Sequence, residues 1–432
     1  MIKHLSTQVV DVFAEKHTDA DASTNTIFSR NALVDPQRAN GQGSIAMVVG
    51  GPGSGKDFNV LLPNLLQMSG SYFVIDPSGV LYRKTADMFK DNGYAVKTLN
   101  LIHPEKSTHY DPLNYVKSDG DVTALIRCFM NTTKGTSCNG TDPFWEQSEA
   151  ALLTALASYC INHQDAERRR FAMMSELLHE AKTDPEATMN KLDALFNEVR
   201  ASEEYAACVK QYGLFKQASE NTAKAILVSA AARFAPFHVE AVRNLISADQ
   251  MELASACEIP TVIYVIVPCG DNPYAFLMHM LVSQMLDVVY HHEQTEHHDE
   301  KQRYHMHMLL NEFANLGLMP DLSRKLIAIK NCNCSCMLFI QAIPQLKNLY
   351  GDNYVTLMDA CDVLVYLGGN EVCTITELPQ IVCSMCDTEI DVEDLRTMHD
   401  HNCMVCVRDF GAFVDDKYPA KDHPNFDKVN NP

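Results

Sequence analysis

Residues 50–57 place glycines, one lysine and one carboxylate at a spacing that suits the binding of phosphate groups. They match the pattern G-x-x-x-x-G-K-[ST] at Gly50, Gly55 and Lys56, but Asp57 stands where serine or threonine is usual. In such a loop successive backbone N–H groups point at phosphate oxygens, the lysine reaches the outer phosphates, and the missing hydroxyl would bind Mg²⁺. The residues expected to contact a nucleotide are Gly50, Gly51, Pro52, Gly53, Ser54, Gly55, Lys56, Asp57 and Phe58.

The sequence on both sides of this loop has the strand–loop–helix arrangement that a phosphate-binding loop requires. Residues 45–49 are a continuous apolar run, which predicts a strand. Leu61, Leu62 and Leu65 recur at helical spacing and predict a helix after the loop. The alternative is a glycine-rich turn that binds nothing, and this context disfavours it.

A second apolar run, residues 304–310, ends in two polar side chains that complete the pattern of a nucleotide site. Such a site needs a neighbouring strand with an acid for Mg²⁺, often followed by a carboxylate that activates water. Asn311 occupies the place of the metal-contacting acid, and Glu312 is the candidate general base. Alone, this segment fits a buried strand that ends in a polar turn equally well, but the phosphate loop favours the catalytic interpretation.

The two positions expected at the metal are altered in opposite senses, because position 57 gains a carboxylate and position 311 loses one. One interpretation is a reciprocal exchange, in which Asp57 supplies the anionic metal contact and Asn311 a neutral oxygen, both of which Mg²⁺ accepts. The other is loss of hydrolysis, because an unneutralised Asp57 would repel the phosphates. The sequence leaves both interpretations open.

Short apolar strands alternate with helical segments on both sides of a long helical stretch. Strands are predicted at residues 45–49, 71–75, 96–101, 261–267, 304–310, 336–341, 363–367 and 403–407. Strands separated by helices imply an α/β fold with a mostly parallel sheet covered on both faces, and a nucleotide at the carboxyl ends of the strands. The predicted domains are an N-terminal helix with an irregular segment (1–30), a nucleotide-binding domain (31–119 and 251–432) and an all-α inserted domain (120–250).

The composition excludes some classes of protein. The chain has 432 residues, 46% of them hydrophobic, enough for one large domain with an insertion. No apolar run approaches the roughly 18–20 residues of a membrane helix, and residues 1–16 are too charged for a secretory signal. We therefore expect a cytoplasmic chain, with a peripheral place at the cell membrane as the alternative. The net charge of -20 disfavours a free-standing nonspecific DNA binder, so any contact with DNA must be local.

The 15 cysteines are irregularly spaced, which argues against a disulfide framework. Two Cys-x-x-Cys pairs, beginning at Cys383 and Cys403, have the spacing of a zinc ribbon. However, residues 403–407 read as a strand, in which residues three apart point to opposite faces. We expect most cysteines to be buried apolar side chains, with zinc as the alternative.

The sequence also resembles a known family through ordered blocks that begin near Ile27. The specific blocks are Asp142-Pro143-Phe144-Trp145-Glu146 and Asn311-Glu312-Phe313-Ala314-Asn315-Leu316-Gly317. The others are 50–56, Asp76-Pro77, 109–112, Phe215-Lys216-Gln217, 341–346, 367–371, Asp415-Asp416-Lys417-Tyr418 and His423-Pro424-Asn425. Through these blocks the chain resembles the coupling ATPases of type IV secretion and conjugation, in particular their Gram-positive conjugative-element branch.

The resemblance implies a RecA-like P-loop NTPase domain with an inserted helical domain, assembled as a homo-hexamer that binds ATP and Mg²⁺ between subunits. It implies that Lys56 binds phosphate, Glu312 polarises water and Gln341 senses the γ-phosphate. The family recruits relaxase-bound single-stranded DNA to a type IV secretion channel at the inner face of the membrane and drives its transfer with ATP. The helical insertion would face this substrate.

The sequence departs from the family at positions that matter for catalysis. An arginine pair is common after the second motif, and here Lys330 and Cys332 occupy those places. Lys330 is therefore the candidate for the trans-acting cation, although lysine lacks the planar fork of arginine. The family's N-terminal membrane anchor is also missing from the sequence as it stands. These departures keep a second function open, a nucleotide-binding adaptor or receptor of the same system with weak or no ATP hydrolysis.

Overall fold

The structure, a computed structural model, describes residues 7–19, 21, 23–36, 45–133, 143–163, 165, 169–182, 191–294, 303–319, 321–408 and 410–429. The chain divides into two compact units. The first comprises residues 1–98, 253–270 and 285–432, and the second comprises residues 99–252 and 271–284. The second unit thus begins at Leu99 and takes in part of a later helix, whereas the predicted inserted domain covers residues 120–250.

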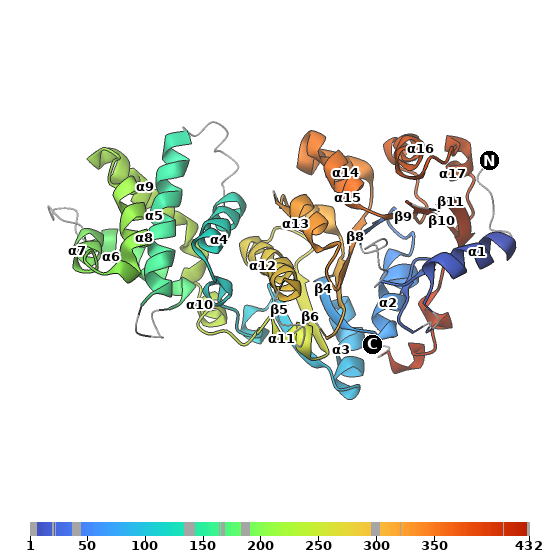
Figure 1. Ribbon diagram of the computed structural model, residues 1–432, viewed down its shortest axis with the longest axis horizontal. Coiled ribbons are helices and arrows are strands. Elements are labelled where there is room, and N and C mark those ends of the chain that lie inside the picture. The colour runs from blue at the N-terminus through green and yellow to red at the C-terminus, as the bar shows by residue number, and fades with distance from the viewer. Residues whose placement is uncertain are drawn as a thin grey trace. The chain divides into compact units, whose positions relative to one another are not determined.

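A nine-stranded sheet lies at the centre of the first unit (Figure 1). Its strand order is β11-β10-β9-β3-β8-β7-β4-β6-β5. The strands from β9 to β6 pair in parallel, whereas β10 is antiparallel to both β9 and β11. The strands are β3 Ile45–Val49, β4 Ser71–Pro77, β5 Ala95–Asn100, β6 Thr261–Val267, β7 Met306–Leu310, β8 Cys334–Ile340, β9 Val363–Tyr366, β10 Asn402–Val407 and β11 Gly411–Asp416. The prediction of an α/β fold with a mostly parallel sheet is confirmed.

Helices connect and cover these strands. Every residue of β3, β6, β7, β8 and β9 is buried, as expected for a parallel sheet with helices on both faces. The helices assigned to this unit are α1 Thr7–His17, α2 Leu62–Gln67, α3 Val80–Asp91, α11 Ser255–Glu258, α13 Leu322–Ile329, α14 Ile343–Tyr350, α15 Tyr354–Ala360, α16 Val372–Cys386 and α17 Val392–Arg396. Helix α12 (Ala275–Glu293) belongs to both units.

The segment expected to be irregular before residue 31 is partly ordered by the helix that follows the phosphate loop. Strands β1 (Thr26–Ile27) and β2 (Leu33–Val34) form a small antiparallel pair. Ile27 donates its N–H to the Asn64 amide oxygen at 2.8 Å and accepts from the Asn64 amide nitrogen at 2.8 Å. The segment is therefore fixed to α2, and the expectation of an irregular segment was wrong for these residues.

The second unit is helical among its described residues, and green tones mark most of it in Figure 1. Its helices are α4 Asp119–Thr132, α5 Pro143–Ile161, α6 Phe171–Lys182, α7 Lys191–Glu198, α8 Ala206–Phe215, α9 Glu220–Arg233 and α10 Glu240–Leu245. Helix α5 is the most deeply buried of these, with Leu152, Leu153 and Leu156 inaccessible to solvent. Asp142, the first residue of the block Asp142-Pro143-Phe144-Trp145-Glu146, lies outside the described residues.

Among the described residues, no helix combines the length and the apolar character that are needed to cross a membrane.

Two buried histidines sit side by side at the amino-terminal end of β7, opposite the end that carries the predicted nucleotide site. The His305 ring bonds to Asn333 Oδ1 at 2.8 Å and to Ser335 Oγ at 2.9 Å. The His307 ring bonds to the same Ser335 oxygen at 3.1 Å and to Ser69 Oγ at 3.2 Å. Both rings therefore have polar neutral partners, and neither has a carboxylate among these contacts.

Acidification is expected to destabilise the first unit through these histidines. Burial lowers the pKa of His305 to about 4 and that of His307 well below its ordinary value, so the folded chain keeps both rings neutral near pH 5. The unfolded chain binds those protons below about 6.5, so stability falls as the pH drops from 6.5 towards 4. For His305 alone we expect a loss of about 2 kcal/mol between pH 7 and pH 5, measured by urea unfolding.

The control for this prediction is the double variant His305→Gln, His307→Gln. It is needed because burial raises the pKa of the Asp76 carboxyl to about 6, and a proton bound there in the folded state opposes the histidines over the same range. The variant retains this opposing contribution. A stability–pH slope in the variant equal to that of the natural chain would contradict the prediction.

Candidate nucleotide site

The predicted phosphate loop lies at the carboxyl ends of three adjacent strands. It begins where β3 ends at Val49. Gly50 donates its N–H to the Ile340 carbonyl at the end of β8 (3.1 Å), and Gly51 donates to the Gly368 carbonyl just beyond β9 (3.0 Å). The loop is therefore fixed to both strands that flank β3, which is the edge where nucleotides bind in parallel sheets.

The conformation of the loop requires glycine at two positions. Gly53 and Gly55 have φ values of +76° and +88°, in the left-handed region that side chains rarely adopt. Between them, the Ser54 hydroxyl is buried and has no hydrogen-bond partner within the described part of the chain. A buried polar atom without a partner is costly, so an acceptor bound in the loop would be stabilised there.

The chain continues from the loop into a helix whose first turn is distorted. Residues Asp57–Leu61 form a π-helical turn before α2. The Leu62 N–H closes this turn on the Asp57 carbonyl, and Pro63, which has no N–H to donate, follows in the first turn of α2. Because the loop leads directly into this turn, the start of the helix lies next to the place expected for phosphates. The free N–H groups at the start of a helix attract anions.

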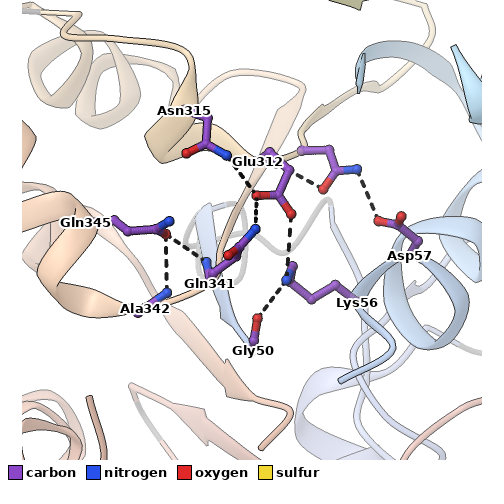
Figure 2. Close-up of polar contacts among 9 residues, drawn as sticks. Gly50, Lys56, Asp57, Glu312, Asn315, Gln341, Ala342 and Gln345 are labelled. Atoms are coloured by element: carbon purple, nitrogen blue, oxygen red, sulfur yellow. Dashed lines mark hydrogen bonds and ion pairs between the residues drawn. The ribbon is translucent and has the colours of Figure 1, made fainter. Parts of the chain in front are cut away.

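The Lys56 side chain is 8% exposed and folds back over the loop (Figure 2). Its ammonium donates to the Gly50 carbonyl at 2.6 Å and lies 3.8 Å from Glu312 Oε1. Burial lowers the pKa of Lys56, while the Glu312 and Asp57 carboxylates act in the opposite direction. The Glu312 carboxylate lies 3.8 Å from this buried ammonium. A bound phosphate group would supply a closer anionic partner.

The Glu312 carboxylate is held by two amides (Figure 2). Its Oε2 accepts from Gln341 Nε2 at 2.7 Å and from Asn315 Nδ2 at 3.1 Å. Glu312 itself has φ 50° and ψ 40°, a left-handed conformation that costs free energy for a residue with a side chain. The fold maintains this strained conformation immediately after β7, and it orients the carboxylate toward the phosphate loop.

The two altered metal-side residues contact each other. The Asn311 amide nitrogen donates to Asp57 Oδ1 at 3.1 Å, and Asn311 Oδ1 accepts the Glu312 N–H at 3.0 Å. Asn311 is buried, at 4% exposure. The structure therefore brings the two altered positions together, and this contact fits both the reciprocal exchange and the loss of hydrolysis.

Not every predicted site residue joins this cluster. The Lys330 ammonium contacts Asp362 Oδ1 at 2.7 Å, and no described contact links it to the phosphate loop of its own chain. Phe58 is 41% exposed and lies beside Phe426. The prediction did not assign a role to Asn315, although it lies three residues after Glu312 in the same block and that spacing could have indicated it.

Within the described part of the chain, the two Cys-x-x-Cys pairs do not converge on one site. The Cys386 and Cys406 sulfurs lie 3.2 Å apart, whereas the Cys403 thiol faces the Asp415 carbonyl at 3.6 Å. Over the described ranges, no three or more His, Cys, Asp or Glu side chains gather in a way that could hold a metal ion. The described strands thus favour the interpretation of buried, apolar cysteines.

Comparison with known proteins shows a family that the chain matches. Residues 7–378 match the family model described as type IV secretory system conjugative DNA transfer. Protein VirD4 of Agrobacterium fabrum (strain C58) is 24% identical over 328 residues, which cover 72% of this chain and 45% of that protein. Protein VirD4 of Rhizobium rhizogenes gives the same values. The chain thus spans about half the length of the curated relatives it matches.

Solved structures share the fold. The unbound bacterial conjugative coupling protein TrwBdeltaN70 is 15% identical, with a TM-score of 0.65 over 95% of this chain and 90% of that one. TrwB has also been solved with the ATP analogue ADPNP and with ADP and Mg²⁺. VirB4 of Thermoanaerobacter pseudethanolicus has a TM-score of 0.54 at 11% identity over 92% of this chain and 97% of that one. Because the family match spans most of its length, the chain belongs to the type IV secretory system family for conjugative DNA transfer.

Proposed function

We propose that this protein is an ATP-driven coupling protein, which brings relaxase-bound single-stranded DNA to a type IV secretion channel and drives its transfer. The observation that carries the proposal is the cluster of Lys56, Glu312 and Gln341. These residues follow the carboxyl ends of β3, β7 and β8, respectively. Its arrangement suits phosphoryl transfer, which depends on positioning and on electrostatic stabilisation. Membership of the conjugative DNA transfer family supports the same function.

ATP with Mg²⁺ fits the residues that are present. The buried Ser54 hydroxyl, which has no partner among the described residues, and the Lys56 ammonium are donors for phosphate oxygens. Asp57 and Asn311 offer a carboxylate and an amide oxygen, which are ligand types that Mg²⁺ takes. When bound, Mg-ATP supplies the cleavable phosphoanhydride bond and the cation that neutralises its charge.

Each residue of the cluster has a definite part in the proposed hydrolysis. The Lys56 ammonium gives up its hydrogen bond to the Gly50 carbonyl and binds the outer phosphates instead. Because Gln341 and Asn315 both donate to Glu312 Oε2, its Oε1 remains to orient a water molecule and to accept the proton of that water. Gln341 donates a hydrogen bond to this carboxylate, and its proposed part is to sense the γ-phosphate.

The proposal includes a homo-hexamer with a nucleotide at each subunit interface, as the family resemblance implies. Within its own chain the Lys330 ammonium pairs with Asp362 at 2.7 Å. We propose that Lys330 acts on the nucleotide of a neighbouring subunit and exchanges this partner when the ring assembles. The helical unit would then contact the DNA or the relaxase.

The test of this function is Mg²⁺-dependent ATP hydrolysis with and without single-stranded DNA. We expect turnover that DNA stimulates and that is lost in Lys56→Ala, because this variant lacks the cation that the outer phosphates need. Tight nucleotide binding without turnover would favour the adaptor function instead. Absence of nucleotide binding in the natural chain would contradict both functions.

The adaptor remains the second candidate because of one observation. The Asn311 amide donates to Asp57 Oδ1, so the two residues satisfy each other without a metal ion. If this contact persists when a nucleotide binds, Asp57 stays close to the phosphates and raises the barrier to hydrolysis. The chain would then bind its partner and the nucleotide, and hydrolyse ATP slowly or not at all.

Restoring the usual residue at position 57 separates the two candidates. If Asp57 has taken over the anionic contact to Mg²⁺, Asp57→Thr lowers Mg²⁺-dependent turnover by about 10-fold, because no carboxylate is left at either position. The double variant Asp57→Thr, Asn311→Asp then recovers turnover, which steady-state hydrolysis assays over a Mg²⁺ titration measure. Higher turnover in the single variant would contradict the exchange.

A further inference from the structure

The C-terminal segment (residues 415–429) packs against the phosphate loop and the helix that follows it. It contains the last two blocks of the family resemblance, residues 415–418 and 423–425. Neither block has a part in the proposed hydrolysis. The Asn425 amide donates to the Leu66 carbonyl at 2.8 Å, and the His423 ring lies 3.0 Å from Gln67 Oε1. Both contacts are to α2, so this segment supports the helix that begins at the phosphate loop.

The same segment is anchored independently at its start. The Asp415 carboxylate is buried and accepts three hydrogen bonds, from Ser29 Oγ at 2.6 Å, from the Asn31 N–H at 2.7 Å and from the Asn31 amide at 2.8 Å. None of these contacts reaches the phosphate loop. Asp415 therefore holds the segment to residues 29–31, and it offers a way to loosen the segment without changing the loop directly.

Lys417 makes the contact that reaches the loop itself. Its side chain is 9% exposed, and its ammonium donates to the Ser54 carbonyl at 3.1 Å and to the Asp400 carbonyl at 2.7 Å. The Lys417 N–H also donates to the His401 carbonyl at 2.8 Å. A buried ammonium with two carbonyl acceptors is a strong, charge-assisted interaction, and here it joins the loop to the segment that precedes β10.

This contact orients one peptide group of the phosphate loop. The Ser54 carbonyl and the Gly55 N–H belong to the same planar trans peptide and point in opposite directions. Because Lys417 holds the carbonyl, the Gly55 N–H points away from Lys417. A positive charge at the carbonyl also polarises the peptide and makes that N–H a stronger donor. Gly55 has no Cβ and a left-handed φ of +88°, so its own side chain does not restrict the orientation of this peptide.

We infer that Lys417 is a positioning residue for the phosphate loop, which fixes the Ser54–Gly55 peptide so that its N–H faces the phosphates of a bound nucleotide. The inference rests on the proposed function, since it deepens the account of the same nucleotide site. The role differs from that of Lys56, because Lys417 acts through a backbone carbonyl and is not expected to touch the ligand. The Ser54 hydroxyl, buried without a partner in the described structure, lies in the same turn.

The test compares the affinity of Lys417→Met and of the natural chain for two ligands, Mg-ATP and inorganic tripolyphosphate. Hydrogen bonds to charged groups contribute enough that we expect a loss of about 10-fold for Lys417→Met. The loss should be the same for both ligands, because the affected peptide faces phosphate and not the base or sugar. Unchanged affinity for both ligands, or a loss confined to Mg-ATP, would overturn the inference.

Two further variants separate positioning from a general loss of stability. Asp415→Asn loosens the C-terminal segment at its other anchor, so it should lower the melting temperature while leaving the affinity of the folded protein unchanged. Lys421→Met removes an exposed lysine of the same segment and should change neither quantity. Equal losses of affinity in Lys417→Met and Asp415→Asn would overturn the inference, because the loop would then respond to loosening of any kind.

The failure of this inference can be told apart from failure of the proposed function. If the natural chain binds neither ligand, or if Lys56→Ala binds both as well as the natural chain does, the phosphate loop is not a nucleotide site and both fail. If the natural chain binds in a manner that requires Lys56 while Lys417→Met binds equally well, the proposed function stands and only the role of Lys417 is wrong.

Discussion

Replacing Glu312 by glutamine is expected to lower ATP turnover by about 10²- to 10⁴-fold while nucleotide affinity stays the same or rises slightly. Glutamine retains an oxygen for the hydrogen bonds from Gln341 and Asn315, but it cannot accept a proton from water. It also removes the negative charge 3.8 Å from the Lys56 ammonium, which leaves that ammonium more attractive to phosphate. Single-turnover hydrolysis and equilibrium nucleotide binding measure the two effects separately.

The control is Glu377→Gln, which removes a carboxylate from the same unit. Glu377 contacts Lys347 at 2.7 Å and makes no described contact with the nucleotide cluster. Turnover in this variant should equal that of the natural chain. If Glu312→Gln retains full turnover, or if both variants lose it equally, Glu312 is not the base of the reaction.

The central strands were predictable because their physical environment leaves a simple pattern in the sequence. β3 (Ile45–Val49) and β6 (Thr261–Val267) are buried on both faces, so nearly every side chain in them is apolar. Their predicted and observed bounds coincide. A continuous apolar run between polar segments is an adequate signal for a strand of this kind, even without any knowledge of its neighbours.

β11 (Gly411–Asp416) was not predicted, because its sequence lacks such a run. It begins with glycine and ends with two aspartates, and it lies at the edge of the sheet. What makes it a strand is its antiparallel pairing with β10, from Val407 opposite Gly411 to Asn402 opposite Asp416. The Asp415 carboxylate is buried, and residues 29–31 supply its hydrogen bonds. Neither partner can be deduced from the local sequence.

The same distinction applies to the nucleotide site. Lys56, Asn311 and Glu312 could be predicted to share one site because each follows a recognisable strand, and the structure brings their side chains together. Gln341 entered only through the family resemblance, and its bond to Glu312 shows a contact that spacing could not indicate. The contact of Lys417 with the Ser54 carbonyl joins residues 363 positions apart and involves a backbone atom. No sequence pattern encodes a contact of this type.

Replacing Arg233 by methionine is expected to destabilise the helical unit by about 3 kcal/mol, because the buried Glu149 carboxylate loses its cation and keeps the Ser229 hydroxyl, a neutral donor. The guanidinium makes two parallel bonds to the Glu149 carboxylate, at 2.9 and 3.0 Å, and donates to the Met130 carbonyl at 2.9 Å. Glu149 is 1% exposed, so water cannot replace these bonds. Urea unfolding followed by the fluorescence of Trp145, the chain's only tryptophan, reports on this unit directly because Trp145 lies in α5.

Helix α9 supplies the matched control, because it carries a second ion pair that is exposed to solvent. Lys224 contacts Glu220 at 2.8 Å, and Lys224→Met should leave the unfolding transition unchanged, since exposed pairs contribute little. The double variant Arg233→Met, Glu149→Leu should recover most of the stability lost in Arg233→Met, because it removes the unpaired charge as well. If the double variant is as unstable as the single one, the arginine stabilises the unit through packing of its stem and not through its charge.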